Sequence, residues 1–358
     1  MSILDRYILR KFLGTFFFIL ALLMAISVIF DISEKIDDFI ESDAPLRKIV
    51  FNYYLNFVVF YSNLFSSLLV FLAVILFTSR MAGLTEIVAI LSSGMSYKRM
   101  LRPFMIGAAI LTAISLIFNH FVVPVSSKYL NEFIFTYIKT RNSSQLNNIR
   151  REYQPGHIVY AEAVSERDFI VFKFSLEQWK DGRLVYKLMS DRANYNENRK
   201  KWTIHNYYER YLNEPTDRIE RGIYKDTTLT FTIGEFNNKT EVATELNSID
   251  LYRFIERERK RSSDKVAEYE VEFHQRTSLP LATFLLTLLG ASIASRKVRG
   301  GVGMHLASGI GLALLYIFAM RVNVVAATKT GFDPLLAVWI PNFIFAALTA
   351  LIYNRAPK

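Results

Sequence analysis

Six long apolar runs constrain the fold of this chain more than any other feature of its sequence. A helix needs roughly 20 mostly apolar residues to cross a bilayer, because each residue adds about 1.5 Å. The runs cover residues 12–30, 49–77, 104–123, 279–294, 304 to about 328, and 335–353. The second run is longer than a bilayer requires, which predicts a tilted helix or one that continues beyond the membrane. The sequence therefore predicts a polytopic helical membrane protein.

Composition supports this interpretation and excludes some chemistry. The chain is 51% hydrophobic, and these residues are clustered rather than spread evenly. It has no cysteine, so disulfides and thiolate chemistry are excluded. The first apolar run is too long for a signal peptide and is not followed by a small-residue cleavage site. We therefore expect it to remain as the first span.

Basic residues in the short loops predict the orientation. With both termini in the cytoplasm, twelve basic residues lie inside: Arg6, Arg10, Lys11, Arg80, Lys98, Arg99, Arg102, Arg296, Lys297, Arg299, Arg355 and Lys358. Five then lie in or near the short outer loops: Lys35, Arg47, Lys48, Arg321 and Lys329. This excess follows the positive-inside rule. The net charge of +10 is thus explained mainly by membrane topology, and we expect no binding to nucleic acid.

The long segment 124–276 must then lie outside, and its pattern changes to short β-rich runs. We expect strands in HIVYAEA, FIVFKFSLE, RLVYKLMS, KWTIHNYYERYL and TTLTFTI, with a turn at Asp181-Gly182. Their spacing is typical of a sandwich, jelly roll or open barrel. The predicted organisation is three spans in 1–123, an inserted all-β, jelly-roll-like domain with helical connectors in 124–276, and three spans in 277–358.

The outer segment shows no pattern typical of a catalytic or metal site. His157 and His205 lie on predicted strands without companion ligands, so ordinary structural roles are the expectation for both. Residues 124–142 have helical spacing and would extend the third span outward. Ser248 could cap a second connecting helix. The mixed charges that follow it suit a solvated helix with ion pairs better than a nucleic-acid interface.

Residues 80–97, RMAGLTEIVAILSSGMSY, separate the second and third spans. The apolar residues in this stretch share one helical face, which predicts a short amphipathic helix over about 81–95 at the cytoplasmic interface. Two interpretations follow from the pattern alone. The helix either turns the chain between two spans with Glu86 in solvent, or presents Glu86 to a cytoplasmic partner.

This stretch resembles the cytoplasmic coupling helix of the LptF/LptG family of lipopolysaccharide export permeases. In that family an acidic residue is followed by apolar residues and an SG or CG pair, here Glu86, Ile87-Val88 and Ser93-Gly94. The N-terminal LDRYILRKF and the late HQRTSLPLATFLLTLLGASIASRKVRGG are also similar to that family. The order of spans and β-domain matches as well, so the resemblance covers essentially the whole chain.

The resemblance implies a permease subunit of an ABC transporter in the bacterial inner membrane. It would pair with a second related permease as an LptF/LptG heterodimer. A cytoplasmic LptB-like ATPase dimer would dock on the coupling helix, here through Glu86, Leu84, Ile87 and Leu91. Periplasmic LptC-like and LptA-like bridge proteins would receive lipopolysaccharide. The chain has no G-x-x-x-x-G-K-[ST] phosphate loop, so we expect it not to be an enzyme and to need no cofactor.

Two basic residues are candidates for contact with the lipid. Lipid A carries phosphates, so its path should combine apolar walls with cations near the outer leaflet. Arg321 lies near the outer end of the fifth span, and Lys35 lies just beyond the first. The alternatives are interfacial snorkelling for Arg321 and an ordinary loop charge for Lys35, which has four acidic neighbours in sequence.

Other classes of protein fit the sequence less well. A mechanotransmission-type permease commonly has four spans with the outer domain after the first, whereas here the domain follows the third. A membrane scaffold or sensor would bind no ATPase and would enclose no lipid-sized cavity. An intramembrane enzyme would need paired carboxylates, a metal set or a nucleophile–base pair in the spans, and none is evident.

Overall fold

A computed structural model describes residues 2–138, 146–165, 169–196, 199, 201–212, 216–229, 231, 241–260, 263, 265–298 and 300–355. The chain divides into two compact units. The helical unit consists of residues 1–137, 241–252 and 267–358, and the β unit of residues 138–240 and 253–266. Parts of the helical connectors expected within 124–276 belong to the helical unit.

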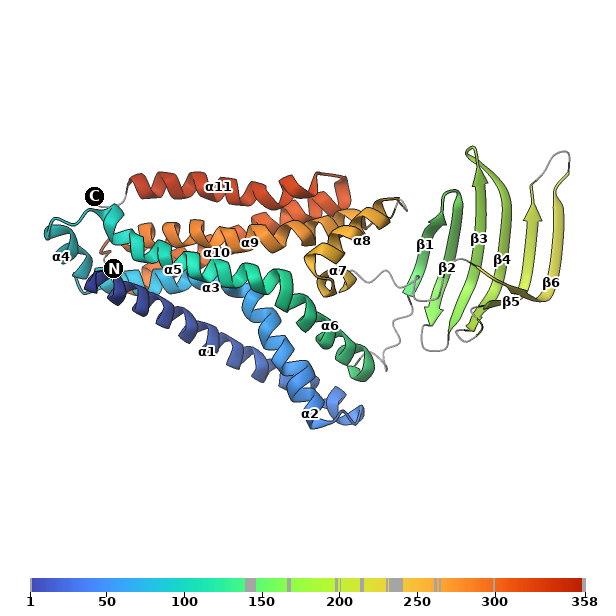
Figure 1. The fold of residues 1–358 in the computed structure, drawn as a ribbon, viewed down its shortest axis with the longest axis horizontal. Coiled ribbons are helices and arrows are strands. Elements are labelled where there is room, and N and C mark those ends of the chain that lie inside the picture. The colour runs from blue at the N-terminus through green and yellow to red at the C-terminus, as the bar shows by residue number, and fades with distance from the viewer. Residues whose placement is uncertain are drawn as a thin grey trace. The chain divides into compact units, whose positions relative to one another are not determined.

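Six helices in the described residues are long and apolar enough to cross a membrane, which confirms the expected three-plus-three spans (Figure 1). The N-terminal three are α1 (Ile3–Glu41), the run α2 (Leu46–Lys48), η1 (Ile49–Tyr54) and α3 (Leu55–Gly83), and the run α5 (Tyr97–Ile117), η2 (Phe118–Val122), α6 (Val123–Phe133) and η3 (Ile134–Ile138). The C-terminal three are α9 (Val266–Ala294), α10 (Gly301–Thr330) and α11 (Pro334–Asn354). Each helix extends beyond its apolar run. The expected outward extension of the third span is therefore present as α6 and η3.

Local capping explains where several of these helices begin and end. Ser2 and Asp5 form a capping box at α1, in which each side chain accepts a hydrogen bond from the other residue's backbone N–H. Gly331, with φ of 73°, closes α10 in the left-handed conformation. Two residues later Asp333 caps α11, and its carboxylate accepts from the N–H of Leu336. The tight connection between the last two spans is thus encoded locally.

Helix α3 lies at the centre of the helical unit. Its buried residues contribute to two apolar clusters, one shared with α1 and α5 and the other with α9, α10 and α11. Close approach depends on glycine at the contacts: a Cβ on Gly309 of α10 would lie 2.4 Å from Ile75, and one on Gly107 of α5 would lie 2.5 Å from Phe12. Small residues permit such packing in a bilayer, where dispersion contacts hold helices together.

Among its described residues, the β unit contains a six-stranded antiparallel sheet whose strands follow sequence order. They are β1 (Leu146–Gln154), β2 (His157–Ser165), β3 (Ile170–Lys180), β4 (Arg183–Asn196), β5 (Lys201–Tyr211) and β6 (Arg218–Thr227). The turn at Asp181-Gly182 is confirmed: φ is 51° and 74°, and Lys180 pairs with Arg183 across the hairpin. One face of the sheet carries the apolar core around the fully buried Trp202.

The two outermost strands, β1 and β6, were not expected from the sequence. The predicted strand in TTLTFTI lies partly outside the described residues; among those described, β6 ends at Thr227, and Leu229 and Phe231 pack onto the core. Phe231 is held there because its carbonyl accepts a hydrogen bond from Trp202 Nε1 at 3.1 Å. The real β6 was missed because its sequence, RIERGIYKDT, is mostly polar, and β1 (LNNIRREYQ) was missed for the same reason.

The return from the β unit to the spans runs through α7 (Glu241–Glu245) and α8 (Ser248–Lys260). The expected cap of α8 is corrected here. Asn247 caps the helix, since its Oδ1 accepts from the N–H of Asp250 at 2.9 Å. Ser248 is the first helical residue, and its hydroxyl contacts His120 and Arg276 instead.

Candidate functional site

The candidate coupling element is α4 (Glu86–Ser92), which is shorter than the expected helix over 81–95. The difference arises because α3 continues to Gly83, so that Met81 belongs to the preceding helix and is buried. Thr85 then adopts the left-handed conformation with φ of 61° and turns the chain into α4. Gly94, with φ of 87°, follows the end of α4 before Ser96 caps α5.

The apolar residues of α4 and its approach divide into an inward and an outward set. Ile87 is only 2% exposed and packs in the core shared by α1, α3 and α5. Leu91 is half-buried against the same core. In contrast, Leu84 is 68% and Val88 is 56% exposed. Ile87, which the sequence pattern placed on the same face as Leu84, thus packs against its own chain.

Glu86 begins α4 and is half-buried. The hydroxyl of Tyr7 on α1 donates a hydrogen bond to its Oε2 at 3.3 Å. Close by in sequence, Asp5 accepts two hydrogen bonds from the guanidinium of Arg99, at 2.6 and 2.7 Å, which joins the start of α1 to the start of α5. The start of α1 is therefore bonded to the first residue of α4 and to the start of α5. Sequence reasoning missed Tyr7, Asp5 and Arg99, because no local pattern pairs residues so far apart.

The structure places Lys35 in a paired, half-buried site. Its Nζ lies 2.5 Å from Asp31 Oδ1 one turn earlier and also donates to the hydroxyl of Tyr53 on η1. Asp31 is 8% exposed, so its charge depends on Lys35 for compensation. The neutralisation by acidic neighbours that the sequence allowed is thus observed, with Asp31 as the partner.

Arg321 has a different environment. It lies on α10 and is exposed, with no ion pair or side-chain hydrogen bond to any residue that the structure describes. Its guanidinium is therefore available to an external anion. Arg321 and Lys35 lie on different helices, α10 and α1.

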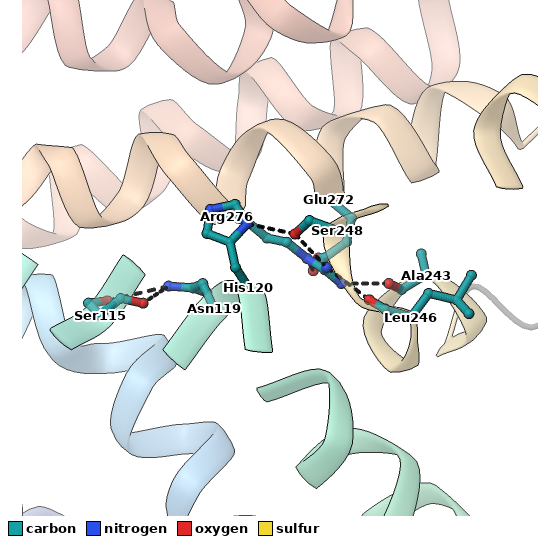
Figure 2. Close-up of polar contacts among 8 residues, drawn as sticks. All are labelled: Ser115, Asn119, His120, Ala243, Leu246, Ser248, Glu272 and Arg276. Atoms are coloured by element: carbon teal, nitrogen blue, oxygen red, sulfur yellow. Dashed lines mark hydrogen bonds and ion pairs between the residues drawn. The ribbon is translucent and has the colours of Figure 1, made fainter. Parts of the chain in front are cut away.

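A buried cation that sequence reasoning did not single out lies near the start of α9 (Figure 2). Arg276 is 3% exposed and donates to the carbonyl oxygens of Ala243 at 2.7 Å and Leu246 at 2.9 Å. Its guanidinium also contacts Glu272 one turn earlier and the hydroxyl of Ser248. These bonds satisfy carbonyls at the end of α7 and fasten α7 and the start of α8 to the fourth span.

His120 on η2 extends this network to the third span. Its Nδ1 lies 2.6 Å from the hydroxyl of Ser248 (Figure 2). One residue earlier, Asn119 bonds back to Ser115 within its own helix. The third and fourth spans are therefore joined through the segment that returns from the β unit. No signal in the sequence pairs His120 with Arg276, because 156 residues separate them.

The core of the β unit also contains a polar group. Glu209 is fully buried, and its Oε1 accepts from the Tyr186 hydroxyl at 2.6 Å and from Lys225 at 2.5 Å. Burial and the bond to Glu209 raise the pKa of Tyr186 above its ordinary value, so its hydroxyl remains a donor. Alternation along β5 could not reveal this, because Asn206, with φ of 50°, shifts the inward positions by one residue.

Histidine, cysteine and acidic side chains do not gather into a metal-binding group within the described residues. His157 is half-buried, and its Nδ1 lies 3.1 Å from the carbonyl oxygen of Pro155. His205 lies beside the ring of Tyr224, and burial lowers its pKa. The described neighbours of the two histidines are thus a backbone carbonyl for His157 and an aromatic ring for His205.

Comparison with known proteins agrees with the architecture. No curated protein matches the sequence closely enough to count as a relative. The model of the family described as lipopolysaccharide export system permease LptF/LptG matches residues 6–355, which is nearly the whole chain. With its six spans, inserted antiparallel sheet and this match, the chain belongs to the LptF/LptG family of permeases of the lipopolysaccharide export ABC transporter.

Proposed function

We propose that α4 is the element through which a separate cytoplasmic ATPase dimer drives this lipopolysaccharide permease. The observation that carries the proposal is the division of α4 into two sides. Ile87 fixes the helix in the core, while Leu84 and Val88 remain exposed beside the half-buried carboxylate of Glu86. An exposed apolar pair next to one charge suits a helix that lies in a groove of a partner.

The rigid support of α4 allows movement to be transmitted. Ile87 packs among residues of three spans, so a displacement of α4 must move those spans or break their packing. Glu86, Leu84 and Leu91 would contact the ATPase, with Leu91 contributing only its exposed part. Ile87 would act inside the permease, because its side chain is not accessible to a partner.

Charge reversal at Glu86 tests this function. Glu86→Lys should reduce co-purification of the ATPase and lipopolysaccharide export, since repulsion replaces attraction at the contact. Glu34→Lys is the matched control, because it reverses an exposed carboxylate on α1 that is far from α4 in sequence. If the Glu86 variant inserts normally into the membrane and still binds the ATPase, Glu86 does not contact the ATPase and only faces solvent.

The proposal requires α4 and both termini to be cytoplasmic and the β unit to be periplasmic. Figure 1 shows the start of α1, the end of α11 and α4 at the same end of the helical unit, as six crossings require. Single cysteines at Ser96 and Asp181 test the orientation, since the native chain has none. A membrane-impermeant thiol reagent should label position 181 in spheroplasts. Labelling at position 96 alone would contradict the orientation.

The remaining partners follow from the export system to which the family belongs. We infer that a second LptF/LptG permease completes the transmembrane path, and that LptC-like and LptA-like proteins accept lipopolysaccharide on the periplasmic side. Of the two lipid-contact candidates, Arg321 is supported by its exposed and unpaired guanidinium. Lys35 would first have to exchange Asp31 for a lipid phosphate.

A further inference from the structure

An open groove runs along α1 beside the end of α3. Its volume is about 1220 Å³. On α1 it extends from Ile3 to Ile19, which corresponds to about 24 Å of helix. The groove therefore begins at the terminal end of the helical unit and reaches well into the apolar part of the first span.

The two ends of this groove differ in polarity. Four cations line the end near the N-terminus and α4: Arg6, Arg10, Lys11 and Arg80. The deeper end is lined by apolar side chains, namely Phe18, Ile19, Leu76 and Phe77. Between these ends lies Gly14, and a Cβ there would meet no atom within 4 Å, so the middle of the groove is open.

The cations of the groove lack compensation within the chain. None of the four has an ion pair or a side-chain hydrogen bond to another described residue, and all four are exposed. The one carboxylate in the lining, Glu86, already accepts a hydrogen bond from Tyr7. Gathering like charges beside a low-dielectric wall is unfavourable unless an anion joins them. The groove thus favours a negatively charged occupant.

We propose that this groove binds an anionic phospholipid from the leaflet that surrounds the chain termini. Its phosphate accepts hydrogen bonds from Arg10 and Arg80, and an acyl chain passes Gly14 to lie against Phe18 and Phe77. Arginine suits this role because its planar guanidinium can bond phosphate through two donors. The polarity of the groove follows that of a phospholipid, with charge at the interface and apolar walls at depth.

The lipid contacts proposed here use neither Leu84 nor Glu86, although both residues also line the groove. A lipid fits the groove better than an acidic protein segment because the apolar half lies along membrane-spanning helices, where acyl chains are the surrounding solvent. The positive-inside rule accounts for basic residues at this end of the chain, but it does not account for their convergence on one open groove.

Lipid binding by the purified full-length chain tests the proposal. Phosphatidylglycerol and zwitterionic phosphatidylcholine are titrated separately into the detergent-solubilised protein, and bound lipid is counted by native mass spectrometry. In the variant Arg10→Gln/Arg80→Gln, phosphatidylglycerol affinity should fall at least tenfold, as expected for the loss of two charge-assisted contacts. The control is Lys98→Gln/Arg102→Gln, which removes two exposed cations near the start of α5 outside the groove.

A second variant tests the shape of the groove without changing its charge. Gly14→Leu places a side chain in the open middle of the groove and leaves every cation in place. It should weaken phosphatidylglycerol binding while thermal unfolding without lipid stays unchanged. Equal affinity in wild type and Gly14→Leu would overturn the site, and so would equal loss in the groove and control double variants. A photoreactive residue at Phe18 should cross-link lipid in membranes, and capture of a protein there instead would overturn the assignment of a lipid.

Discussion

Free and paired charges are distributed unevenly along the helical unit, although Arg99 near α4 is paired with Asp5 and Arg321 toward the other end is unpaired among the described residues. Near α4, Arg6, Arg10 and Arg80 are exposed and form no ion pair with any described residue. Toward the other end, Lys35 is paired with Asp31, and the buried Arg276 bonds two backbone carbonyls and Glu272. Helix α1 alone contains both situations: Arg6 and Arg10 are free in its first turns, where Asp5 is paired with Arg99, and Lys35 is paired with Asp31 near its end.

This difference separates charges that can bind something else from charges that hold the fold together. A buried charge is costly unless its partners are in place, so Arg276 and Lys35 are committed to their own chain. An exposed, unpaired cation contributes little to stability and remains available to a phosphate or a carboxylate. Removing charges at the two ends should therefore have different consequences.

The largest effect is expected at Arg276. Arg276→Met keeps much of the side-chain volume but leaves the carbonyls of Ala243 and Leu246 without their donor. We expect the free energy of unfolding to fall by about 3 kcal/mol, measured in mixed detergent. Arg102→Met, at the other end, should change it by less than about 0.5 kcal/mol. Similar values for the two variants would break the comparison.

The next effect concerns Lys35 and shows whether its pairing is structural. Lys35→Met should destabilise the chain by about 2 kcal/mol, because Asp31 loses its counter-charge in a buried position. Adding Asp31→Leu should restore most of that loss, since an apolar pair can replace a buried ion pair. Lipopolysaccharide export by the stable double variant then tests Lys35 itself. Normal export would exclude it from the lipid path.

At the α4 end, a buried and an exposed apolar residue can be compared to separate packing from partner binding. Ile87→Ala should lower the free energy of unfolding by about 2 kcal/mol, because it opens a cavity in a packed core. Leu84→Ala should leave stability within about 0.5 kcal/mol but weaken ATPase co-purification. If Leu84→Ala instead unfolds the protein and leaves ATPase binding intact, the outward role of this residue is wrong.

The smallest effect on stability is expected at Arg321, where the readout is lipid contact. Arg321→Glu should reduce cross-linking of lipopolysaccharide to a photoreactive residue at Asn323 much more than Arg321→Lys, which keeps the charge. ATPase activity of the assembled transporter checks that each variant folds. Equal cross-linking in wild type and both variants would show that Arg321 only reaches interfacial water.

Local sequence determined several parts of this protein. Six apolar runs fixed the number and order of the spans, since a bilayer sets a minimum length for each. Asp181-Gly182 specified a hairpin turn because both positions need positive φ. The stretch around Glu86 indicated a short interfacial helix between two spans, and α4 lies there. These features depend on residues close together in the chain.

Only the tertiary structure decided which residues of the candidate sites are exposed to a partner and which are buried or bonded within the chain. The apolar pattern around Glu86 could not distinguish buried Ile87 from exposed Leu84, because α3 and α4 meet at a turn that breaks the helical period at Thr85. The contacts of Arg276 with Ala243 and of Arg99 with Asp5 join distant segments. No local propensity encodes such contacts, which form only when packed helices bring the segments together and exclude the water that would otherwise solvate each charge.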